Sequence, residues 1–527
     1  MIEKSKKDKF TMGGITPPPL FLNHAEHGKF VNRIISVFMP KHDKPMAVPY
    51  HRGYAYQAAK RGGGVREMLS IALPMVVSHA CYTVMTFTDR LFLSRLSSAE
   101  MNAAMGGGIT AFMMMTFFFG IIAYSTALTA QYFGAGQKNR CPIVITQAII
   151  LAIISYPIIL LARPLGILLF EFMKISPEQM AHQKIYFNIL IYGIIFGIFR
   201  PCFTGFFSGI GKTKIVMISS AVAMGLNIVV NYILIFGKLG FPALGIRGAA
   251  YGTIIGSAAG LSVMVWKYLS RENRQEYNIM KSFHFDKKAM GELLHFGYPA
   301  GIEMFLNLLA FSVLIMIFHS HSLATATAVT IVFNWDMVSF IPLLGVGISV
   351  TSLVGRYMGM GKPDIAHLSV MSGLKLSLVY SFFIIISFTG FTESLVGIFR
   401  PAQVSDIFIE AFPRAVFMLR MAAIYVTMDA LIVIFAGALR GAGDSFWAMA
   451  LSVAMHWTLV PVLYFMLKLN NCSPEQAWLA VVLIFVIFSF FIYLRYRSGK
   501  WRDIKVLQPA QKPMDIMPDD FHVSRDL

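Results

Sequence analysis

The sequence predicts an all-α polytopic membrane protein with about twelve transmembrane helices in two six-helix bundles. Of its 527 residues, 56% are hydrophobic and only 14% are charged, whereas a soluble domain has about 25% charged residues. Apolar runs long enough to cross a membrane recur from residue 68 to residue 496. Residue patterns of the first half return in the same order in the second half. Together these observations exclude an ordinary soluble enzyme.

The apolar runs define the helices. A helix of about 20 apolar residues crosses a hydrocarbon core roughly 30 Å thick. Lipid offers no hydrogen-bond partners to a free backbone, so the runs must be helical. We place them at residues 68–94, 103–132, 142–163, 185–208, 213–237, 247–269, 292–318, 323–354, 369–390, 408–438, 445–468 and 476–496.

The net charge of +18 is explained by topology rather than by nucleic-acid binding, because Lys and Arg cluster in the two tails and in alternate loops. The basic loops are expected on the cytoplasmic side. With an even number of spans, both termini are then cytoplasmic. We expect a multi-pass protein of the cell membrane, the inner membrane if bacterial, without a cleaved secretory signal. The basic loop residues are Lys138, Arg140, Lys212, Lys214, Arg356, Lys362 and those of 271–288.

The chain divides into five predicted regions. Residues 1–65 form a basic cytoplasmic tail, interrupted by prolines at 17–19 and glycines at 62–64. This tail is either disordered, solvated chain or a contact for anionic lipid. The remaining regions are an N-terminal six-helix lobe at 66–270, a cytoplasmic linker at 271–290, a C-terminal six-helix lobe at 291–498 and a cytoplasmic tail at 499–527.

An internal repeat relates the two lobes. The spacing that separates Pro74 from Pro299 also separates a five-residue set at 130–136 from its match at 355–361. A second set at 203–213 returns at 435–445, at a slightly longer spacing. Glycines at helix ends could reflect turn chemistry, but the paired prolines and aromatic residues favour a duplicated bundle with a pseudo-twofold axis along the membrane normal. Pro74 and Pro299 are predicted hinges or helix breaks. The matched residues are Ala130, Gln131, Tyr132, Gly134 and Gly136 with Gly355, Arg356, Tyr357, Gly359 and Gly361, then Phe203, Gly205, Gly209, Gly211 and Thr213 with Phe435, Gly437, Gly441, Gly443 and Ser445.

Three motifs suggest nucleotide or metal chemistry, and each has a simpler explanation. The run Gly211 to Thr213 ends like a phosphate-binding loop, but Phe206 stands where the first glycine is required. His319 and His321 have no further ligand nearby, so we interpret them as surface residues. The four cysteines are far apart and form no CxxC pair. We therefore predict no metal site and no cofactor.

Four acids within the predicted spans are candidate functional residues. An ionisable group in the hydrocarbon region costs at least about 2.5 kcal/mol, so its presence indicates function. One of the acids, at 89, could instead reach the membrane interface. Another, at 336, could pair with a basic residue such as Lys375. Tyr425 lies one turn before the last acid on the same helix face. The acids are Asp89, Glu303, Asp336 and Asp429.

These acids fit coupling to a cation. Burial favours the protonated form of a carboxyl group, so a buried acid can carry a proton. A monovalent cation can neutralise it instead, with the Tyr425 hydroxyl and free backbone carbonyls as further ligands. The sequence leaves H⁺ and Na⁺ open. Asn227 and Asn231, one turn apart, could contribute oxygens to an ion or hydrogen-bond between helices.

From about residue 66 to residue 497, the sequence resembles the multidrug and toxic compound extrusion (MATE) family, and within it the NorM-type branch. The resemblance rests on Pro74 with TFTDRLFLSRLS, on TAQYFGAGQ and on GIGKTKIVMISSAVAMGLNIVVNYILIFGKLGFPALGIRGAAYGT. It implies export of organic, often cationic, compounds in exchange for Na⁺ or H⁺. It also implies that Glu303, Tyr425 and Asp429 bind a cation in the C-terminal half, and that Asp89, Asn227, Asn231 and Thr253 bind an ion in the N-terminal half. Many relatives have Asp where Asn231 stands.

We therefore expect a secondary antiporter that works by alternating access between two lobes, not an enzyme. Its partners would be a small organic substrate and membrane lipid, without nucleic acid, and the protein would act as a monomer. The coupling ion would replace any cofactor. Two alternatives remain at this stage: a lipid-linked oligosaccharide flippase of related fold, which would need a cationic cavity, and a membrane receptor or scaffold that transports nothing.

Overall fold

The computed structural model describes residues 62–172, 177–400 and 406–507. This part of the chain contains helices, turns and loops but no strand. Twelve of its helices are long and apolar enough to cross a membrane. The predicted all-α class and the number of spans are therefore confirmed. Most of the predicted N-terminal tail and the C-terminal residues 508–527 lie outside the described residues.

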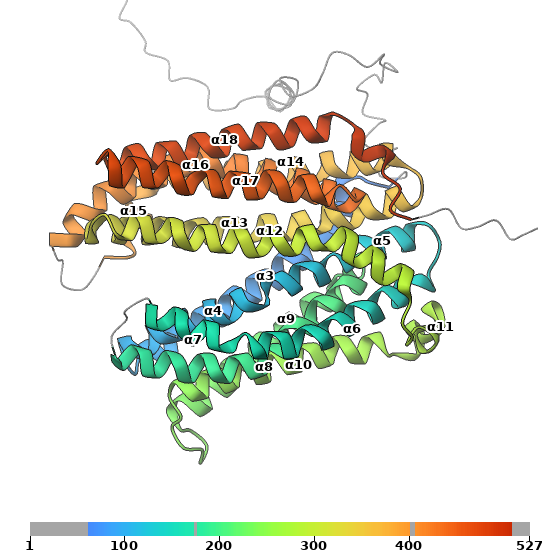
Figure 1. Ribbon diagram of the computed structural model, residues 1–527, viewed down its shortest axis with the longest axis horizontal. Coiled ribbons are helices and arrows are strands. Elements are labelled where there is room, and N and C mark those ends of the chain that lie inside the picture. The colour runs from blue at the N-terminus through green and yellow to red at the C-terminus, as the bar shows by residue number, and fades with distance from the viewer. Residues whose placement is uncertain (1–61, 173–176, 401–405, 508–527) are drawn as a thin grey trace, which may run out of the picture. The chain divides into compact units, whose positions relative to one another are not determined.

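The first half supplies six spans and three short extra helices (Figure 1). The second span is interrupted at Tyr124, where α4 passes into α5, although the sequence predicted one continuous helix. The short helices α7, α11 and η1 were not predicted. The elements are α3 (Val65–Ser94), α4 (Ser98–Ala123), α5 (Ser125–Gly134), α6 (Arg140–Leu161), α7 (Arg163–Phe172), α8 (Pro177–Gly209), α9 (Lys214–Phe236), α10 (Ile246–Tyr268), α11 (Arg271–Tyr277) and the 3-10 helix η1 (Ile279–Lys281).

The second half repeats this order of spans. Side-chain caps fix several helix starts: Asp286 accepts from the Ala289 backbone, and Ser473 forms a capping box with Gln476. The long helix α12 begins inside the predicted linker. The elements are α12 (Lys287–His319), α13 (Leu323–Gly359), α14 (Pro363–Gly390), α15 (Thr392–Gly397), α16 (Asp406–Ala442), α17 (Ser445–Tyr464), the π-helical η2 (Phe465–Leu469), α18 (Pro474–Arg497) and the 3-10 helix η3 (Lys500–Asp503).

Neither Pro74 nor Pro299 breaks its helix, contrary to our expectation. Pro74 lies inside α3 and Pro299 lies inside α12, and both helices continue for several turns beyond the proline. A proline in a helix interior removes one backbone hydrogen bond, but packing against neighbouring helices can maintain the helix. The two prolines are therefore positions of local weakness within continuous helices.

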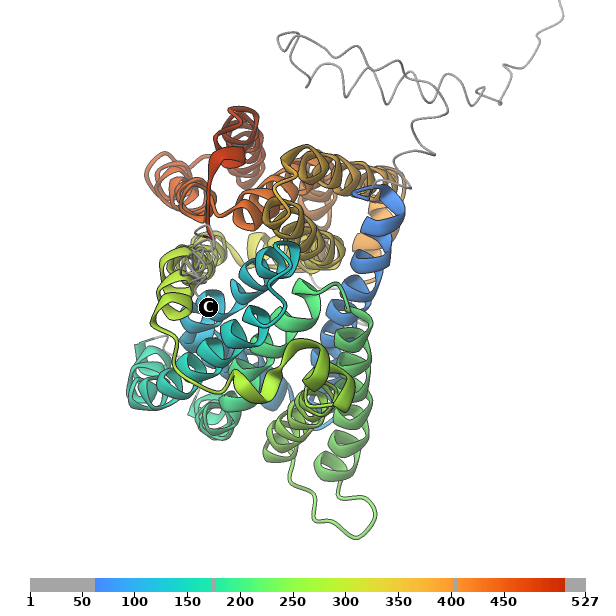
Figure 2. The same cartoon turned by 90° about the vertical axis from the view of Figure 1, so that its right-hand side faces the viewer.

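The helices of the two halves form two groups, seen end-on in Figure 2. The first helix of each half leaves its own group to pack on the second span of the other: α3 packs on α13, and α12 packs on α4. Each first helix also packs on the fifth span of its own half, α9 or α17. This exchange follows the pseudo-twofold repeat that the sequence predicts.

Paired glycines allow these crossings. A side chain on Gly120 would lie 2.6 Å from the Ala300 carbonyl oxygen, and one on Gly345, its counterpart in the repeat, would lie 2.7 Å from the Val76 backbone nitrogen. The same reciprocity joins Gly134 to the Arg356 backbone and Gly359 to the Gln131 backbone. The repeated glycines are close-packing positions, which confirms the duplicated bundle. Turn chemistry accounts for four others, Gly136, Gly211, Gly361 and Gly443, which have positive φ angles of 68° to 98°.

One end of the bundle carries the loops that are rich in Lys and Arg, and we call it the basic end. Here Lys138 donates to Glu276 at 3.0 Å, and Arg140 pairs with Asp286 at 2.5 Å. The hydrogen bond from Lys138 lowers the pKa of Glu276 below its ordinary value. These contacts fasten the segment between the halves to the first group of helices.

Candidate functional site

Two polar levels lie between α3 and α9 in the first lobe. The helices run in a parallel register in which Ser78 meets Ser220, with their hydroxyl oxygens 2.6 Å apart, and Asp89 meets Asn231. Eleven residues separate these levels on each helix, which is about 16 Å along the helix axis. The level at Asp89 contains the predicted N-terminal site, and the level at Ser78 lies nearer the basic end.

The first-lobe acid site consists of Asp89, Asn227, Asn231 and Thr253. Asp89 is only 5% exposed. The Asn231 amide donates to one carboxylate oxygen of Asp89, and the Thr253 hydroxyl lies 3.0 Å from the other. Asn227 lies beside this carboxylate, and both its amide nitrogen and its amide oxygen are buried without a hydrogen-bond partner. The sequence prediction therefore brought together four residues that do meet in the fold.

Glycines on α10 create the space for this site. A side chain on Gly252 would overlap the Asn231 amide oxygen, and one on Gly256 would lie 2.8 Å from the Asn227 Cβ. The two asparagines can therefore fill the space between α9 and α10 while their amides remain beside Asp89. Small residues at helix crossings commonly allow this close approach within membranes.

The hydrogen-bond partners of Asp89 are neutral. It forms no ion pair with any residue that the structure describes. The amide oxygens of Asn227 and Asn231 are buried without hydrogen-bond partners. A buried carboxylate and unpartnered amide oxygens are the ligand types that suit a proton or a small cation.

The second-lobe acid site consists of Asp336, Tyr425 and Asp429. The Tyr425 hydroxyl donates to Asp336 on α13, and the two aspartates interact electrostatically. Tyr425 is 2% exposed, and its ring packs 5.3 Å from that of Phe485. Asp336 makes no ion pair with Lys375 in the part of the chain that the structure describes, so that alternative is not realised. Asp336 instead joins two residues that the sequence analysis had grouped without it.

Glu303 lies apart from this acid site. Its carboxylate pairs with Arg440 on α16 at 2.5 Å and is 8% exposed. Arg440 follows Asp429 by eleven residues on the same helix, about 16 Å along the axis. Among the described residues, the Glu303 carboxylate therefore pairs with Arg440 and has no hydrogen bond or ion pair with Tyr425 or Asp429 in this conformation. Sequence spacing could not show this, because Glu303 is on a different helix.

The two lobes meet at the basic end through matched hydrogen bonds that the sequence analysis missed. The Tyr357 hydroxyl donates to Glu67 of the first lobe at 2.7 Å, and the Tyr132 hydroxyl donates to Glu292 of the second lobe at 2.5 Å. The two tyrosines, and likewise the two glutamates, are as far apart in the sequence as the paired prolines, and each glutamate stands seven residues before one of these prolines. That spacing was the available sequence signal. We call these contacts, with the Gly134 and Gly359 crossings, the inter-lobe seam.

Both lobes of the chain match a known protein family. The MatE family matches residues 74–233 and 299–465, one stretch in each lobe, and both stretches begin at the paired prolines. The chain belongs to the MatE family. This is a family of membrane transporters, so the predictions of a transporter and of a non-enzyme are confirmed, as is the resemblance to NorM-type proteins.

Curated relatives span nearly all of the MatE chain. "Probable multidrug resistance protein NorM" of Thermotoga maritima is 28% identical, over 84% of this chain and 94% of its own length. "Multidrug resistance protein PmpM" of Pseudomonas aeruginosa is 27% identical, over 88% and 97%. "Multidrug resistance protein NorM" of Vibrio cholerae is 24% identical, over 78% and 89%.

Solved structures share the MatE fold. A MOP superfamily transporter from Pyrococcus furiosus has a TM-score of 0.76 at 19% identity, over 84% of this chain and 97% of that chain. An outward-facing multidrug resistance MATE family transporter also has a TM-score of 0.76, at 18% identity, over 85% and 98%. These similarities establish the arrangement of the helices.

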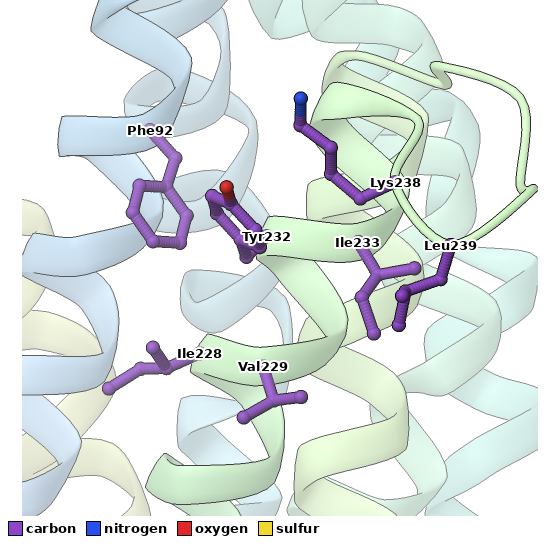
Figure 3. A pocket seen from close by; sticks show the side chains of 7 residues that line it. All are labelled: Phe92, Ile228, Val229, Tyr232, Ile233, Lys238 and Leu239. Carbon is purple, nitrogen blue, oxygen red and sulfur yellow. The ribbon is translucent and has the colours of Figure 1, made fainter.

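A pocket of about 590 Å³ lies between α3 and α9, and three of its lining residues, Phe92, Ile228 and Tyr232, are close in the sequence to residues of the first-lobe acid site (Figure 3). The rings of Phe92 and Tyr232 pack edge to face beside it, with ring centres 6.2 Å apart. None of the predicted site residues lines it. The lining residues are Phe92, Ile228, Val229, Tyr232, Ile233, Lys238 and Leu239.

The two histidines of the HxH motif contact α13 separately. His319 lies 3.3 Å from the Thr330 hydroxyl, and His321 lies 3.3 Å from the Thr325 hydroxyl. Within the described ranges, no three His, Cys, Asp or Glu residues are grouped as metal ligands. These contacts give the histidines a structural role at the start of α13.

Proposed function

We propose that this MatE transporter exports organic compounds, many of them cationic, in exchange for Na⁺ or H⁺ that moves inward. Its relatives are named as multidrug resistance proteins. The flippase alternative finds no support, because a lipid diphosphate requires a cationic cavity. The most deeply buried charged side chains among the described residues are all acidic, namely Asp89, Glu303, Asp429 and Asp444. The receptor alternative is excluded by the family.

The observation that carries this proposal is the Asp89 carboxylate, buried without a basic partner beside unpartnered amide oxygens. An unpaired buried charge is costly in a membrane protein unless something neutralises it. A coupling ion and a cationic substrate could each do so, but not both at once. Competition for one carboxylate is a physical basis for exchange, because each ligand then displaces the other.

The second-lobe acid site offers another place for the coupling ion. Asp336 and Asp429 repel each other when both are charged, so a proton or a cation between them would stabilise the pair. The Tyr425 hydroxyl can supply an additional oxygen ligand. We propose that this site contributes to coupling, and that Glu303 joins it only if the Arg440 ion pair opens during the transport cycle.

We further propose that the basic end faces the cytoplasm, with both termini on that side, and that one chain is sufficient for transport. The positive-inside rule supports the orientation. The inter-lobe seam closes the basic end, so this conformation would be open toward the outside. Rocking of the lobes that separates the seam would then expose the same sites to the cytoplasm.

Transport by the purified full-length protein in proteoliposomes tests the proposal. Na⁺ and pH gradients are imposed separately, and uptake of the fluorescent cation rhodamine 123 is followed. We expect one gradient to drive uptake and Asp89→Asn to abolish the response, with Glu171→Gln, an exposed acid of the first lobe, as the control. Gradient-driven uptake that persists unchanged in Asp89→Asn would contradict the assignment of the ion to this pocket.

A further inference from the structure

The linker between the lobes, residues 271–288, lies against the first lobe at the basic end, where Figure 1 labels its helix α11. The Ser282 hydroxyl lies 3.4 Å from the Thr146 hydroxyl of α6. The His284 carbonyl oxygen accepts a hydrogen bond from the Gln147 amide at 3.0 Å. Thr146 and Gln147 follow the start of α6 by six and seven residues, which is about 9–10 Å along the axis. The linker therefore runs beside α6 rather than beyond its end.

This level of α6 belongs to the membrane. The helix has 22 residues, so it is about 33 Å long, which is only slightly more than a hydrocarbon core roughly 30 Å thick. Its first turns therefore cross the layer of lipid headgroups and the boundary with the acyl chains. A linker side chain that points away from the lobe at this level meets lipid headgroups and not bulk water.

The outward side of the linker is apolar. Met280, Phe283 and Phe285 are 61%, 53% and 61% exposed. Their neighbours Ile279 and Ser282 are buried, so the linker has an inner side that packs on the first lobe and an outer side with three large apolar side chains. Apolar side chains of an interfacial segment enter the boundary between headgroups and acyl chains. The outer side is therefore suited to that region of the bilayer.

The linker also carries positive charge that the described part of the protein does not neutralise. Each of its three acids pairs with a basic residue of the first lobe, at distances of 2.5 to 3.0 Å between nitrogen and oxygen. Its own basic residues form no ion pair with any residue that the structure describes. They are Arg271, Arg274, Lys281, Lys287 and Lys288. The exposed apolar side chains thus lie among lysines without a counter-charge.

We propose that the segment 280–288 is a docking surface for the membrane. Its lysines bind the headgroups of anionic phospholipids, and its three large apolar side chains enter the layer beneath. Basic and apolar side chains that alternate along one segment match a surface that is anionic above and apolar below. A soluble protein could not reach side chains at this depth beside α6, so the partner is the bilayer itself. The inference does not depend on the substrate or the coupling ion.

A fluorescent label tests the depth of the segment. Three of the four cysteines are buried and Cys472 is half-buried, so Cys472→Ser provides a background for labelling the full-length protein. Phe283→Cys is labelled with nitrobenzoxadiazole in proteoliposomes that contain spin-labelled phosphatidylcholine, which quenches fluorophores within the membrane. We expect blue-shifted emission and strong quenching at this position. The control is Lys362→Cys, an exposed residue between α13 and α14 at the same end, where quenching should be much weaker.

A matched set of charge variants tests the headgroup contact. Binding of phosphatidylglycerol and of phosphatidylcholine to the full-length protein in detergent is measured by native mass spectrometry. A lysine near an anionic surface contributes about a fivefold preference, so Lys281→Gln with Lys287→Gln should weaken phosphatidylglycerol binding about 25-fold and leave phosphatidylcholine unchanged. Replacing both lysines by arginine should retain binding, because the charge is kept. Arg247→Gln with Arg400→Gln, two exposed basic residues at the opposite end, should change neither lipid.

Three results would overturn the docking surface. The first is a label at Phe283→Cys that emits and is quenched like the one at Lys362→Cys, which places the segment in water. The second is blue-shifted emission without quenching by the spin-labelled lipid, which assigns the surface to another protein molecule. The third is phosphatidylglycerol binding that the lysine variant leaves unchanged, or that the Arg247 and Arg400 control weakens equally, which assigns headgroup binding to other residues.

Discussion

The two lobes share a scaffold but differ in their charges. The acid site of the first lobe has a single carboxylate, Asp89, among neutral amides and a hydroxyl, whereas that of the second has two interacting carboxylates, Asp336 and Asp429. Nearer the basic end, the first lobe has Arg200 without an acid, and the second has an acid paired with an arginine. Each lobe thus resolves the cost of buried charge differently.

This difference distinguishes residues that the helix packing requires from residues that bind ligands. Glycines at helix crossings and the tyrosine–glutamate pairs of the seam are repeated, because both lobes need the same close approach. The buried acids are not repeated, since a ligand site is needed only where a ligand binds. The first lobe, in which the Asp89 carboxylate has no basic partner, is therefore expected to respond most strongly to ligands.

The largest effect should come from removing the charge of Asp89. Asp89→Asn keeps the size of the side chain but removes its charge from the pocket. Gradient-driven uptake should fall by as much as about a hundredfold, because a hydrogen-bonded charge contributes up to about 3 kcal/mol. The comparison variant Asp429→Asn should cause a smaller loss. If Asp429→Asn were the more damaging of the two, coupling would reside mainly in the second lobe.

The second-lobe acids should behave as one unit. Asp336→Asn and Asp429→Asn each remove the mutual repulsion and the shared ion, so the double variant should be little worse than either single one. We expect each single variant to lower uptake about tenfold, from loss of one charged contact. Additive losses in the double-mutant cycle, measured with rhodamine 123, would show that the two aspartates act independently.

Breaking the ion pair between Glu303 and Arg440 should lower the stability of the protein more than its transport rate. Arg440→Gln leaves Glu303 buried without a counter-charge. Breaking a buried ion pair costs about 3–5 kcal/mol, and because Arg440 is 31% exposed we expect about 2 kcal/mol. Thermal unfolding in detergent should show this loss and its recovery in the double variant Arg440→Gln with Glu303→Gln. A double variant as unstable as the single one would contradict the pairing.

Substitutions in the inter-lobe seam test whether the repeat matters for function as well as for structure. Gly134→Ala and Gly359→Ala each place a methyl group against backbone of the other lobe, so they should open the basic end to similar degrees. A cost of about 1.4 kcal/mol changes the ratio of closed to open forms tenfold. Distances between spin labels at Lys138 and Lys362 measure this opening, and Gly390→Ala, which meets open space, is the control. Opening by only one of the glycine variants would show that the seam is not symmetric.

Local sequence patterns predicted the helices because these depend on apolar length. The first-lobe acid site spans α3, α9 and α10, and its four residues were grouped by the resemblance to the MATE family, because spacing within one helix relates only Asn227 to Asn231. The pairing of Glu303 with Arg440 could not be predicted, because it joins side chains of two different helices, α12 and α16. Arg200 was overlooked because a lone basic residue near the middle of a predicted span has no motif. The glutamates of the seam could have been found from their constant distance to the prolines.

The smallest effect should come from the ion pair that fastens the linker to the first lobe. Glu276 accepts from Lys138 at 3.0 Å and lies 3.5 Å from Lys212. Because both groups are partly exposed, Glu276→Gln should cost less than about 1 kcal/mol. The hydrogen bond lowers the pKa of Glu276 below its ordinary 4.5, so its contribution is complete above that pH and is lost as the pH falls further. Thermal midpoints of wild type and variant should therefore differ slightly at pH 7, and the difference should shrink as the pH falls below 4.5. An undiminished gap in acid would assign the stabilisation to something other than this charge.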